Sequence, residues 1–184
     1  MRLFVAVYPP DDVVHDLAAR VAELHVGRAA AEGINTRLAP RDHWHVTLAF
    51  LGEVADARLS NVVGALGEAV APAAPFEVRL AGGGRFGAIL WVGVGGDLPA
   101  LTRLSRLARR GLSGARIRYD RKRFQPHLTI ARPGDRLDRQ LVAADRAALD
   151  RYEGPPWRVA EVVLMRSHPG PKPRYDRLAA FPLS

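Results

Sequence analysis

The sequence predicts an α+β protein built from two similar halves, and three observations lead to this fold class. The composition of the 184-residue chain, 48% hydrophobic and 25% charged, is typical of a globular protein with a hydrophobic core. Segments with strand and helix patterns alternate as strand, helix, strand, helix, hairpin, helix, strand, helix and hairpin. A short motif, histidine-apolar-threonine-apolar, occurs once in each half, with its two copies 82 residues apart.

The elements of the first half follow from hydrophobic patterning and from the residues that interrupt it. Short apolar runs rich in β-branched and aromatic residues predict strands, and apolar residues at helical spacing predict helices. Pro9, Pro10, Gly33 and Gly52 mark boundaries between them. We therefore predict strands over 3–8 and 44–51, helices over 13–31 and 57–70, and a hairpin of 76–80 and 88–94 whose loop contains the glycines 82–84.

The second half is assigned by the same patterns. The segment 98–110 carries Leu101, Leu104 and Ala108 on one face and arginines on another, which is typical of an amphipathic helix. Proline-rich turns interrupt the chain at 155–156 and 169–173. We predict helices over 98–110 and 137–149, and strands over 127–131, 158–165 and 175–180.

The composition excludes several classes of chemistry. The chain contains no cysteine, which excludes disulfides, thiolate nucleophiles, iron–sulfur clusters and cysteine-based zinc sites. The first apolar run, Leu3 to Tyr8, is far shorter than a membrane-spanning helix, and no cleavage signal follows it. We expect a cytoplasmic protein that does not bind membranes and whose catalysis relies on oxygen and imidazole groups.

The positive charge of the chain suggests a polyanionic partner. The formal net charge is +8 and the sequence pI is near 10.9, values that favour contact with nucleic acid. A basic stretch from Arg116 to Arg123 leads directly into the second motif. We expect this stretch either to lie at the mouth of the site and contact an RNA backbone, or to form a solvated surface loop.

The repeated motif predicts a pair of imidazoles and a pair of hydroxyls. On a strand, side chains two residues apart share a face, so His45 lies beside Thr47, and His127 beside Thr129. If the two strands meet, one neutral imidazole accepts a proton from water while a protonated one donates to a leaving alkoxide. The threonines then donate to phosphate oxygens, where charge develops in the transition state.

Two alternative interpretations of these histidines stay open. A histidine on an apolar strand is commonly a half-buried structural residue, and threonine is a good strand former. His43 and His45 are also two residues apart, so together with His127 they are compatible with a three-histidine zinc site. In that case the paired threonines would have no role.

The residues carry a resemblance to a known family. The segments His45-Val46-Thr47-Leu48-Ala49-Phe50-Leu51-Gly52 and Pro126-His127-Leu128-Thr129-Ile130-Ala131-Arg132 resemble the motifs of the 2H phosphoesterase superfamily. Within it, the chain is most similar to the RNA 2′,3′-cyclic phosphodiesterases, also called 2′-5′ RNA ligases. The start from Arg2 to Val7 and the ending with Arg166-Ser167, Gly170, Tyr175 and Phe181-Pro182-Leu183 are similar as well, so nearly the whole chain is covered.

The resemblance implies a fold, a reaction and a set of roles. The fold is one bilobal α+β domain over residues 1–184, with two antiparallel-rich sheets flanking a central cleft and helices outside. The reaction is hydrolysis of an RNA 2′,3′-cyclic phosphate end to a 2′-phosphate without metal or cofactor, with weak reverse 2′-5′ ligation. By this analogy His45 protonates the departing O3′, and His127 activates water. Thr47, Thr129 and Arg132 hold phosphate oxygens, and Phe50 lies against the nucleoside.

Simple strand alternation conflicts with two of the implied roles. It places Phe50 and Arg132 on the face opposite the histidines, so a twist or bulge at the strand end is needed to bring them into the site. We expect a monomer acting on RNA ends, including tRNA fragments, or on small nucleotides. The alternatives are a phosphodiesterase for another cyclic phosphate, such as one on ADP-ribose, and a non-catalytic RNA-binding module.

Overall fold

Two four-stranded antiparallel sheets form the centre of the molecule. The computed structural model describes residues 1–184. The first sheet has the strand order β2-β1-β7-β8 and the second the order β5-β4-β3-β6. The strands are β1 (Arg2–Val7), β2 (Val46–Glu53), β3 (Phe76–Phe86), β4 (Ile89–Gly96), β5 (His127–Ala131), β6 (Trp157–Val159), β7 (Glu161–His168) and β8 (Arg174–Pro182). The two motif strands, β2 and β5, are therefore edge strands at equivalent positions.

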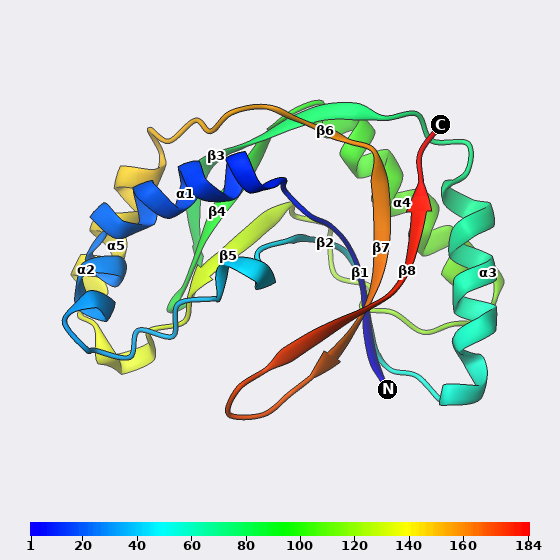
Figure 1. The fold of residues 1–184 in the computed structure, drawn as a ribbon, viewed down its shortest axis with the longest axis horizontal. Coiled ribbons are helices and arrows are strands. Elements are labelled where there is room, and N and C mark those ends of the chain that lie inside the picture. The colour runs from blue at the N-terminus through cyan, green and yellow to red at the C-terminus, as the bar shows by residue number, and fades with distance from the viewer.

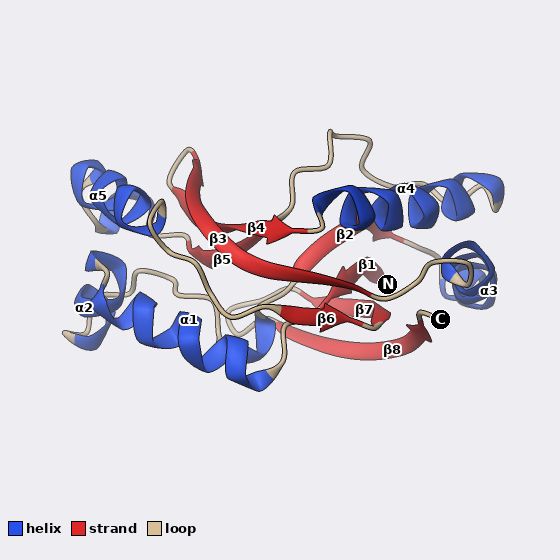
Figure 2. Cartoon of the chain, turned by 90° about the horizontal axis from the view of Figure 1, so that it is seen from above, coloured by secondary structure: helices blue, strands red, loops and turns tan.

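The helices gather at the two ends of the sheets, as Figures 1 and 2 show. At one end α1, α2 and α5 lie together, with α5 packed on β3 and β4. At the other end α3 packs on α4, and α4 contacts β2. The helices are α1 (Asp11–Glu23), α2 (His25–Ala31), α3 (Leu59–Val70), α4 (Leu98–Gly114) and α5 (Arg139–Leu149), with 3-10 turns at Arg41–His43, Asp56–Arg58 and Gly134–Arg136. No helix of the structure has both the length and the apolar character needed to cross a membrane.

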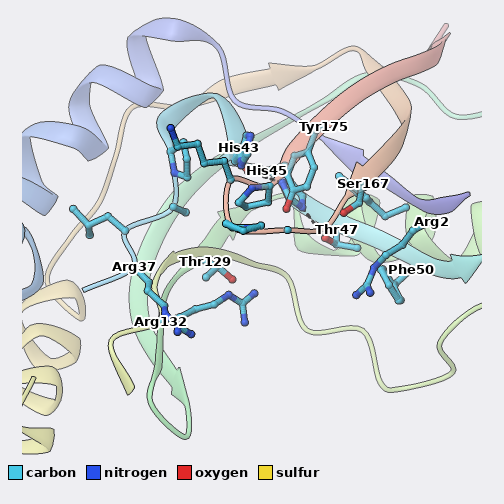
Figure 3. Close-up of a pocket in the computed structure, with 18 of the residues that line it drawn as sticks. Arg2, Arg37, His43, His45, Thr47, Phe50, Thr129, Arg132, Ser167 and Tyr175 are labelled. Carbon is cyan, nitrogen blue, oxygen red and sulfur yellow. Dashed lines mark hydrogen bonds between the residues drawn. The ribbon is translucent and has the colours of Figure 1, made fainter. Parts of the chain in front are cut away.

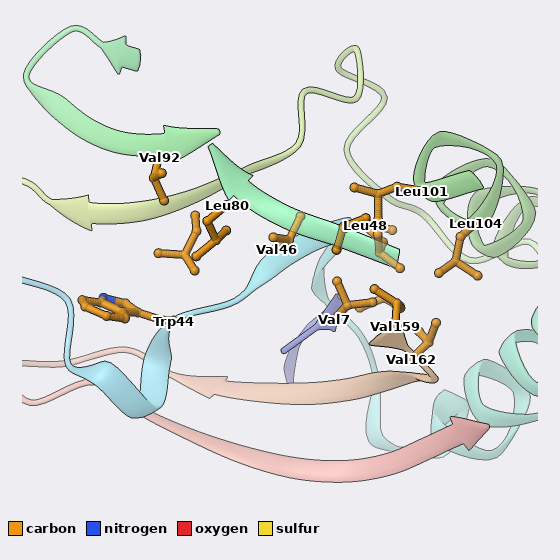
Figure 4. Packing of buried hydrophobic residues seen from close by; sticks show 14 of the residues in the cluster. Val7, Trp44, Val46, Leu48, Leu80, Val92, Leu101, Leu104, Val159 and Val162 are labelled. Carbon is orange, nitrogen blue, oxygen red and sulfur yellow. The ribbon is translucent and has the colours of Figure 1, made fainter. Parts of the chain in front are cut away.

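One hydrophobic cluster of 39 buried residues extends between the sheets and under the helices. Figure 4 shows side chains of both sheets meeting, among them Val7 and Val46 from the first sheet and Leu80 and Val92 from the second. Leu101 and Leu104 of α4 join the same cluster, as the amphipathic pattern of this helix predicts. The core thus holds the two motif strands at a fixed separation.

The helix predicted over 13–31 is wrong in one respect, because it breaks at Leu24. Leu24 has an extended backbone with ψ 158°, and α2 folds back against the end of α1. A Cβ atom at Gly27 would lie 2.0 Å from the carbonyl oxygen of Val21, so only glycine permits this approach. The carboxylate of Asp145, on α5, accepts hydrogen bonds from the backbone N–H groups of His25 (2.7 Å) and Val26 (3.0 Å) and so caps α2.

The predicted glycine-rich hairpin loop is also wrong. Gly82 to Gly84 lie inside β3, which continues to Phe86, and the turn is made at Gly87 with φ 58°. A Cβ at Gly83 would lie 2.5 Å from the carbonyl oxygen of Arg146, and one at Gly84 would lie 2.1 Å from the ring of Trp91. These glycines therefore serve close packing of α5 and Trp91 on the strand, and they do not end it.

The strand predicted over 158–165 is in fact two strands in different sheets. β6 pairs with β3 and β7 pairs with β1, and the chain passes from one sheet to the other at Ala160. The first sheet is completed by the carboxyl-terminal hairpin β7–β8, so the two lobes are not consecutive halves of the chain. The turn of this hairpin, residues 169–173, reaches the cleft described next.

Candidate active site

A cavity of about 910 Å³ lies between the motif strands and contains all six side chains predicted from the sequence. Its lining includes His45, Thr47, Phe50, His127, Thr129 and Arg132. The rest comes mainly from β1, from the loop before β2 and from the β7–β8 turn. Figure 3 shows Phe50 beside Arg2 at one end of the cavity and Arg132 beside Arg37 at the other.

His45 is held by hydrogen bonds on both ring nitrogens. Nδ1 lies 2.6 Å from the carbonyl oxygen of His43, which can only accept, so Nδ1 carries the hydrogen. Nε2 lies 3.1 Å from Oγ1 of Thr47, so the hydroxyl donates to the neutral ring. The ring stacks on Phe4 with centroids 4.7 Å apart. These contacts hold Nε2 of His45 next to the hydroxyl of Thr47, and both residues line the cavity.

His127 is anchored in the same way in the second sheet. Its Nδ1 donates to the carbonyl oxygen of Gln125, two residues earlier, at 2.7 Å. The rings of Phe86 and Trp91 lie 5.0 and 5.5 Å from its ring. Both motifs therefore fix the same imidazole tautomer through the carbonyl two residues before the histidine, and both leave Nε2 for the cavity.

Burial keeps both imidazoles uncharged in the unliganded site. Loss of hydration lowers the pKa of His45 to about 4, and the hydrogen bond to the His43 carbonyl opposes this only in part. Burial likewise lowers the pKa of His127, and the positive charge of Arg132 lowers it further. Both shifts favour the neutral imidazoles in the unliganded site, and a bound anion would favour their protonated forms.

Equivalent β-bulges bring Phe50 and Arg132 into the cavity. In β2 the residues Val5 and Ala6 pair with Ala49 and Thr47, so one extra residue, Leu48, enters the strand. In β5 the residues Leu90 and Trp91 pair with Ala131 and Thr129, which leaves an extra residue after Thr129. Each bulge shifts the alternation by one residue, and the side chain five positions after each histidine then faces the cavity.

Neighbouring segments donate hydrogen bonds to the carbonyl oxygens of the two extra residues. The carbonyl oxygen of Leu48 accepts hydrogen bonds from Oγ of Ser105 at 2.7 Å and from Nε of Arg109 at 3.1 Å, both on α4. The carbonyl oxygen of Ile130 accepts from the backbone N–H of Ala39 at 2.8 Å. The extra residues thus leave no carbonyl without a partner, and the geometry of the site is fixed by contacts from distant segments.

Several cavity residues were not predicted from the motifs. Arg2, Arg37, Lys172 and Tyr175 line the cavity, and three of them bring positive charge. Arg2 lies over the ring of Phe50, with its guanidinium carbon 5.0 Å from the ring centroid. No local pattern marks these positions, because they reach the site only through the pairing of β1 with β2, through the loop before β2 and through the β7–β8 hairpin.

The structure does not favour the zinc hypothesis. The ring of His43 stacks on Tyr175 with centroids 4.2 Å apart, while its carbonyl orients His45. No three or more histidine, aspartate or glutamate side chains lie together in an arrangement that could hold a metal ion. His43 therefore acts as a support for His45, through its backbone, and for the β7–β8 hairpin, through its ring.

Comparison with known proteins establishes the family. Residues 9–171 match the family model described as the 2'-5' RNA ligase superfamily. The chain belongs to this superfamily. A curated relative from Geobacillus stearothermophilus, named RNA 2',3'-cyclic phosphodiesterase, is 34% identical over 154 residues, which are 77% of this chain and 46% of that protein. A Thermus thermophilus relative of the same name is 31% identical, covering 100% of this chain and 90% of the relative.

Solved structures confirm the predicted fold class for this member of the 2'-5' RNA ligase superfamily. The crystal structure of E. coli LigT in apo form superposes with a TM-score of 0.77, covering 100% of this chain and 97% of that chain. The identity between the two is 22%, so this likeness concerns the fold alone. The bilobal α+β arrangement with two antiparallel sheets, expected from the repeated motif and the resemblance, is therefore correct.

Proposed function

We propose that the protein hydrolyses 2′,3′-cyclic phosphate ends of RNA to 2′-phosphates by general acid and base catalysis with two histidines. The observation that carries the proposal is the matched pair of imidazoles, each fixed through Nδ1 and each contributing to one cavity beside a threonine. The names of the Geobacillus and Thermus relatives support the same substrate. Because each lobe contributes one histidine, the functional unit is the whole chain, residues 1–184.

In the proposed reaction, water attacks phosphorus, and the bond from phosphorus to O3′ breaks. His127 takes the proton from water, and His45 gives a proton to the departing O3′. The depressed pKa of His45 supports this assignment, because a lower pKa makes its protonated form a stronger acid. The bound phosphate supplies the negative charge that favours protonation of the buried ring. When the 5′-hydroxyl of a second RNA takes the place of water, the same steps break the same bond from phosphorus to O3′ and form a 2′-5′ linkage, which gives weak ligation.

The other cavity residues bind the substrate. Thr47 and Thr129 donate hydrogen bonds to non-bridging oxygens, and Arg132 contributes a positive charge to the same group. Phe50, with Arg2 over one face, forms an apolar surface for the terminal nucleoside. A non-catalytic RNA-binding module would need only the cationic groups, and the two orientated imidazoles favour an enzyme.

The direct test is incubation with an oligoribonucleotide that ends in a 2′,3′-cyclic phosphate. We expect a single product, the 2′-phosphate, identified by its retention against synthetic 2′- and 3′-phosphate standards. Formation of the 3′-phosphate would contradict the assigned leaving group. If the protein does not turn over this substrate but hydrolyses a cyclic phosphate on ADP-ribose, the substrate is a small nucleotide and not an RNA end.

The lowered imidazole pKa values predict an acidic pH optimum. Both groups have a pKa below the ordinary value of 6.5, so both limbs of the profile of kcat/KM are expected below that pH. As pH rises, His45 loses the proton it must donate, and kcat/KM is expected to fall about tenfold per pH unit throughout the range above pH 6.5. The profile is measured with a cyclic mononucleotide at constant ionic strength. A plateau that extends to pH ~8 would show that the free enzyme contains an acid of higher pKa.

Activity is expected to survive exhaustive treatment with a chelator. The cavity offers imidazole and hydroxyl groups on two separate lobes, and these do not form a ligand set for a catalytic metal. The measurement compares turnover of the cyclic substrate before and after dialysis against EDTA. Loss of turnover that returns with added zinc would support the three-histidine site instead.

A further inference from the structure

The positive charge of the protein is concentrated in one segment. Of its 27 basic and 19 acidic residues, ten basic and one acidic lie between Leu98 and Arg132. The remainder of the chain is close to neutral. The segment comprises α4, the loop 115–126 and β5, and we call residues 115–126 the basic loop. The excess positive charge therefore belongs to this segment and not to the protein as a whole.

Most cations of the basic loop have no internal partner. The guanidinium groups of Arg116, Arg118, Arg121 and Arg123 form no hydrogen bond or ion pair within the protein. The single acid of the loop, Asp120, pairs with Lys122 at 3.6 Å. Unpaired arginines at close spacing are suited to phosphate groups, which they bind through two parallel N–H donors.

A second cavity, of about 400 Å³, is built from this loop. It is lined by Ser113, Arg116, Ile117, Arg118, Tyr119 and Arg121. The ring of Tyr119 lies under two guanidinium groups, those of Arg109 and Arg121, each 5.9 Å from the ring centroid. Its hydroxyl accepts a hydrogen bond from Oγ of Ser113 at 3.2 Å, so the ring is held in place. The cavity thus combines free cations with a fixed aromatic surface.

Hydrogen bonds place the basic loop beside the Phe50 end of the active site. The backbone N–H of Asp120 donates to the carbonyl oxygen of Phe50 at 2.7 Å. Arg109 bonds both the carbonyl of Leu48 in β2 (3.1 Å) and that of Lys122 in the loop (2.9 Å). Phe50 lines the catalytic cavity at the end where Arg2 lies, as Figure 3 shows. The basic loop is therefore attached to the part of β2 that carries Phe50.

We propose that the basic loop and its cavity bind the single-stranded RNA on the 5′ side of the cyclic phosphate. This inference rests on the proposed function, in which the terminal nucleoside lies against Phe50. The preceding nucleotides then leave the site past Asp120, and their phosphates meet Arg118 and Arg121. The preferred substrate is accordingly an oligonucleotide, because a cyclic mononucleotide has no phosphate to place there.

The test compares long and minimal substrates in a double variant. The double variant Arg118→Gln/Arg121→Gln removes two of the proposed phosphate contacts. The control Arg28→Gln/Arg151→Gln makes the same change of charge at exposed positions outside the basic loop, on α2 and just after α5. For single strands, the logarithm of the binding constant falls by about 0.7 for each contacted phosphate when the salt concentration rises tenfold. Each contact is therefore worth about fivefold in affinity between ~0.1 M and ~1 M salt. We therefore expect oligonucleotide binding to weaken about 25-fold at ~0.1 M and hardly at all at ~1 M.

Binding and turnover are measured separately, so that the two proposals can fail independently. Affinity is measured by fluorescence anisotropy with an oligonucleotide ending in the 2′-phosphate, and turnover with the cyclic oligonucleotide and a cyclic mononucleotide. The expected result is a selective loss for the oligonucleotides in the loop variant, with mononucleotide turnover and the control variant unchanged. Equal loss for both substrates, or no loss for either, would overturn the inference. If the parent protein binds RNA but hydrolyses neither cyclic substrate, the proposed function fails while the docking result stands.

Discussion

Replacing either His45 or His127 by alanine is expected to lower the rate of cyclic phosphate hydrolysis by about 10²-fold to 10⁴-fold, the usual contribution of a general acid or base. Each imidazole is fixed by a carbonyl two residues before it, so that its Nε2 is held in position for proton transfer. The two losses are not expected to add in the double variant, since both histidines act in one transition state. Turnover of a cyclic mononucleotide at saturating concentration is the measurement.

A matched control separates chemistry from folding. His15 is exposed on α1 and lies outside the cavity, so His15→Ala removes an imidazole without touching the site. We expect this variant to keep the parent rate. Near-parent turnover of a folded His45→Ala or His127→Ala protein would exclude the two-imidazole mechanism, and thermal unfolding of each variant shows whether it is folded.

Replacing Asp145 by alanine is expected to lower the free energy of unfolding by about 2 to 4 kcal/mol, the cost of removing a helix cap and leaving buried donors unsatisfied. The carboxylate is only 1% exposed and accepts from the N–H groups of His25 and Val26. It also lies 2.8 Å from Nδ1 of His25. Urea unfolding monitored by circular dichroism gives the free energy directly.

The controls for this variant are a graded and a neutral substitution. Asp145→Asn keeps one acceptor oxygen and is expected to lose less stability than Asp145→Ala. Asp135 is exposed and forms no hydrogen bond or ion pair, so Asp135→Ala is expected to leave the free energy of unfolding within about 0.5 kcal/mol. If Asp145→Ala had as small an effect as Asp135→Ala, the capping of α2 by this carboxylate from α5 would contribute little to the free energy of unfolding.

The sequence predicts the parts of the fold that depend on local pattern. Strand alternation places His45 with Thr47 and His127 with Thr129, and these pairs meet in one cavity. Amphipathic spacing likewise predicts the buried face of α4. Both signals are short-range, because the residues that form them lie within one or two turns or pleats of one another.

The sequence does not predict features that distant contacts decide. The bulge at Leu48 depends on Ser105 and Arg109, more than fifty residues away, so alternation alone assigns Phe50 to the wrong face. The break at Leu24 depends on close packing at Gly27 and on Asp145. Gly83 is a turn signal in isolation, yet α5 packs against it and keeps it within β3.

The equivalent bulges also give the cleft a direction. The position five residues after each histidine faces the cavity, and one copy is the aromatic Phe50 while the other is the cationic Arg132. Around a near-twofold pair of imidazoles, a cyclic phosphate offers two almost interchangeable ester oxygens. Under the proposed function, the aromatic ring at one end and the Arg132 guanidinium at the other (Figure 3) are expected to select one orientation of the ribose. The residues that break the symmetry, and not the histidines, are then expected to decide which ester bond opens.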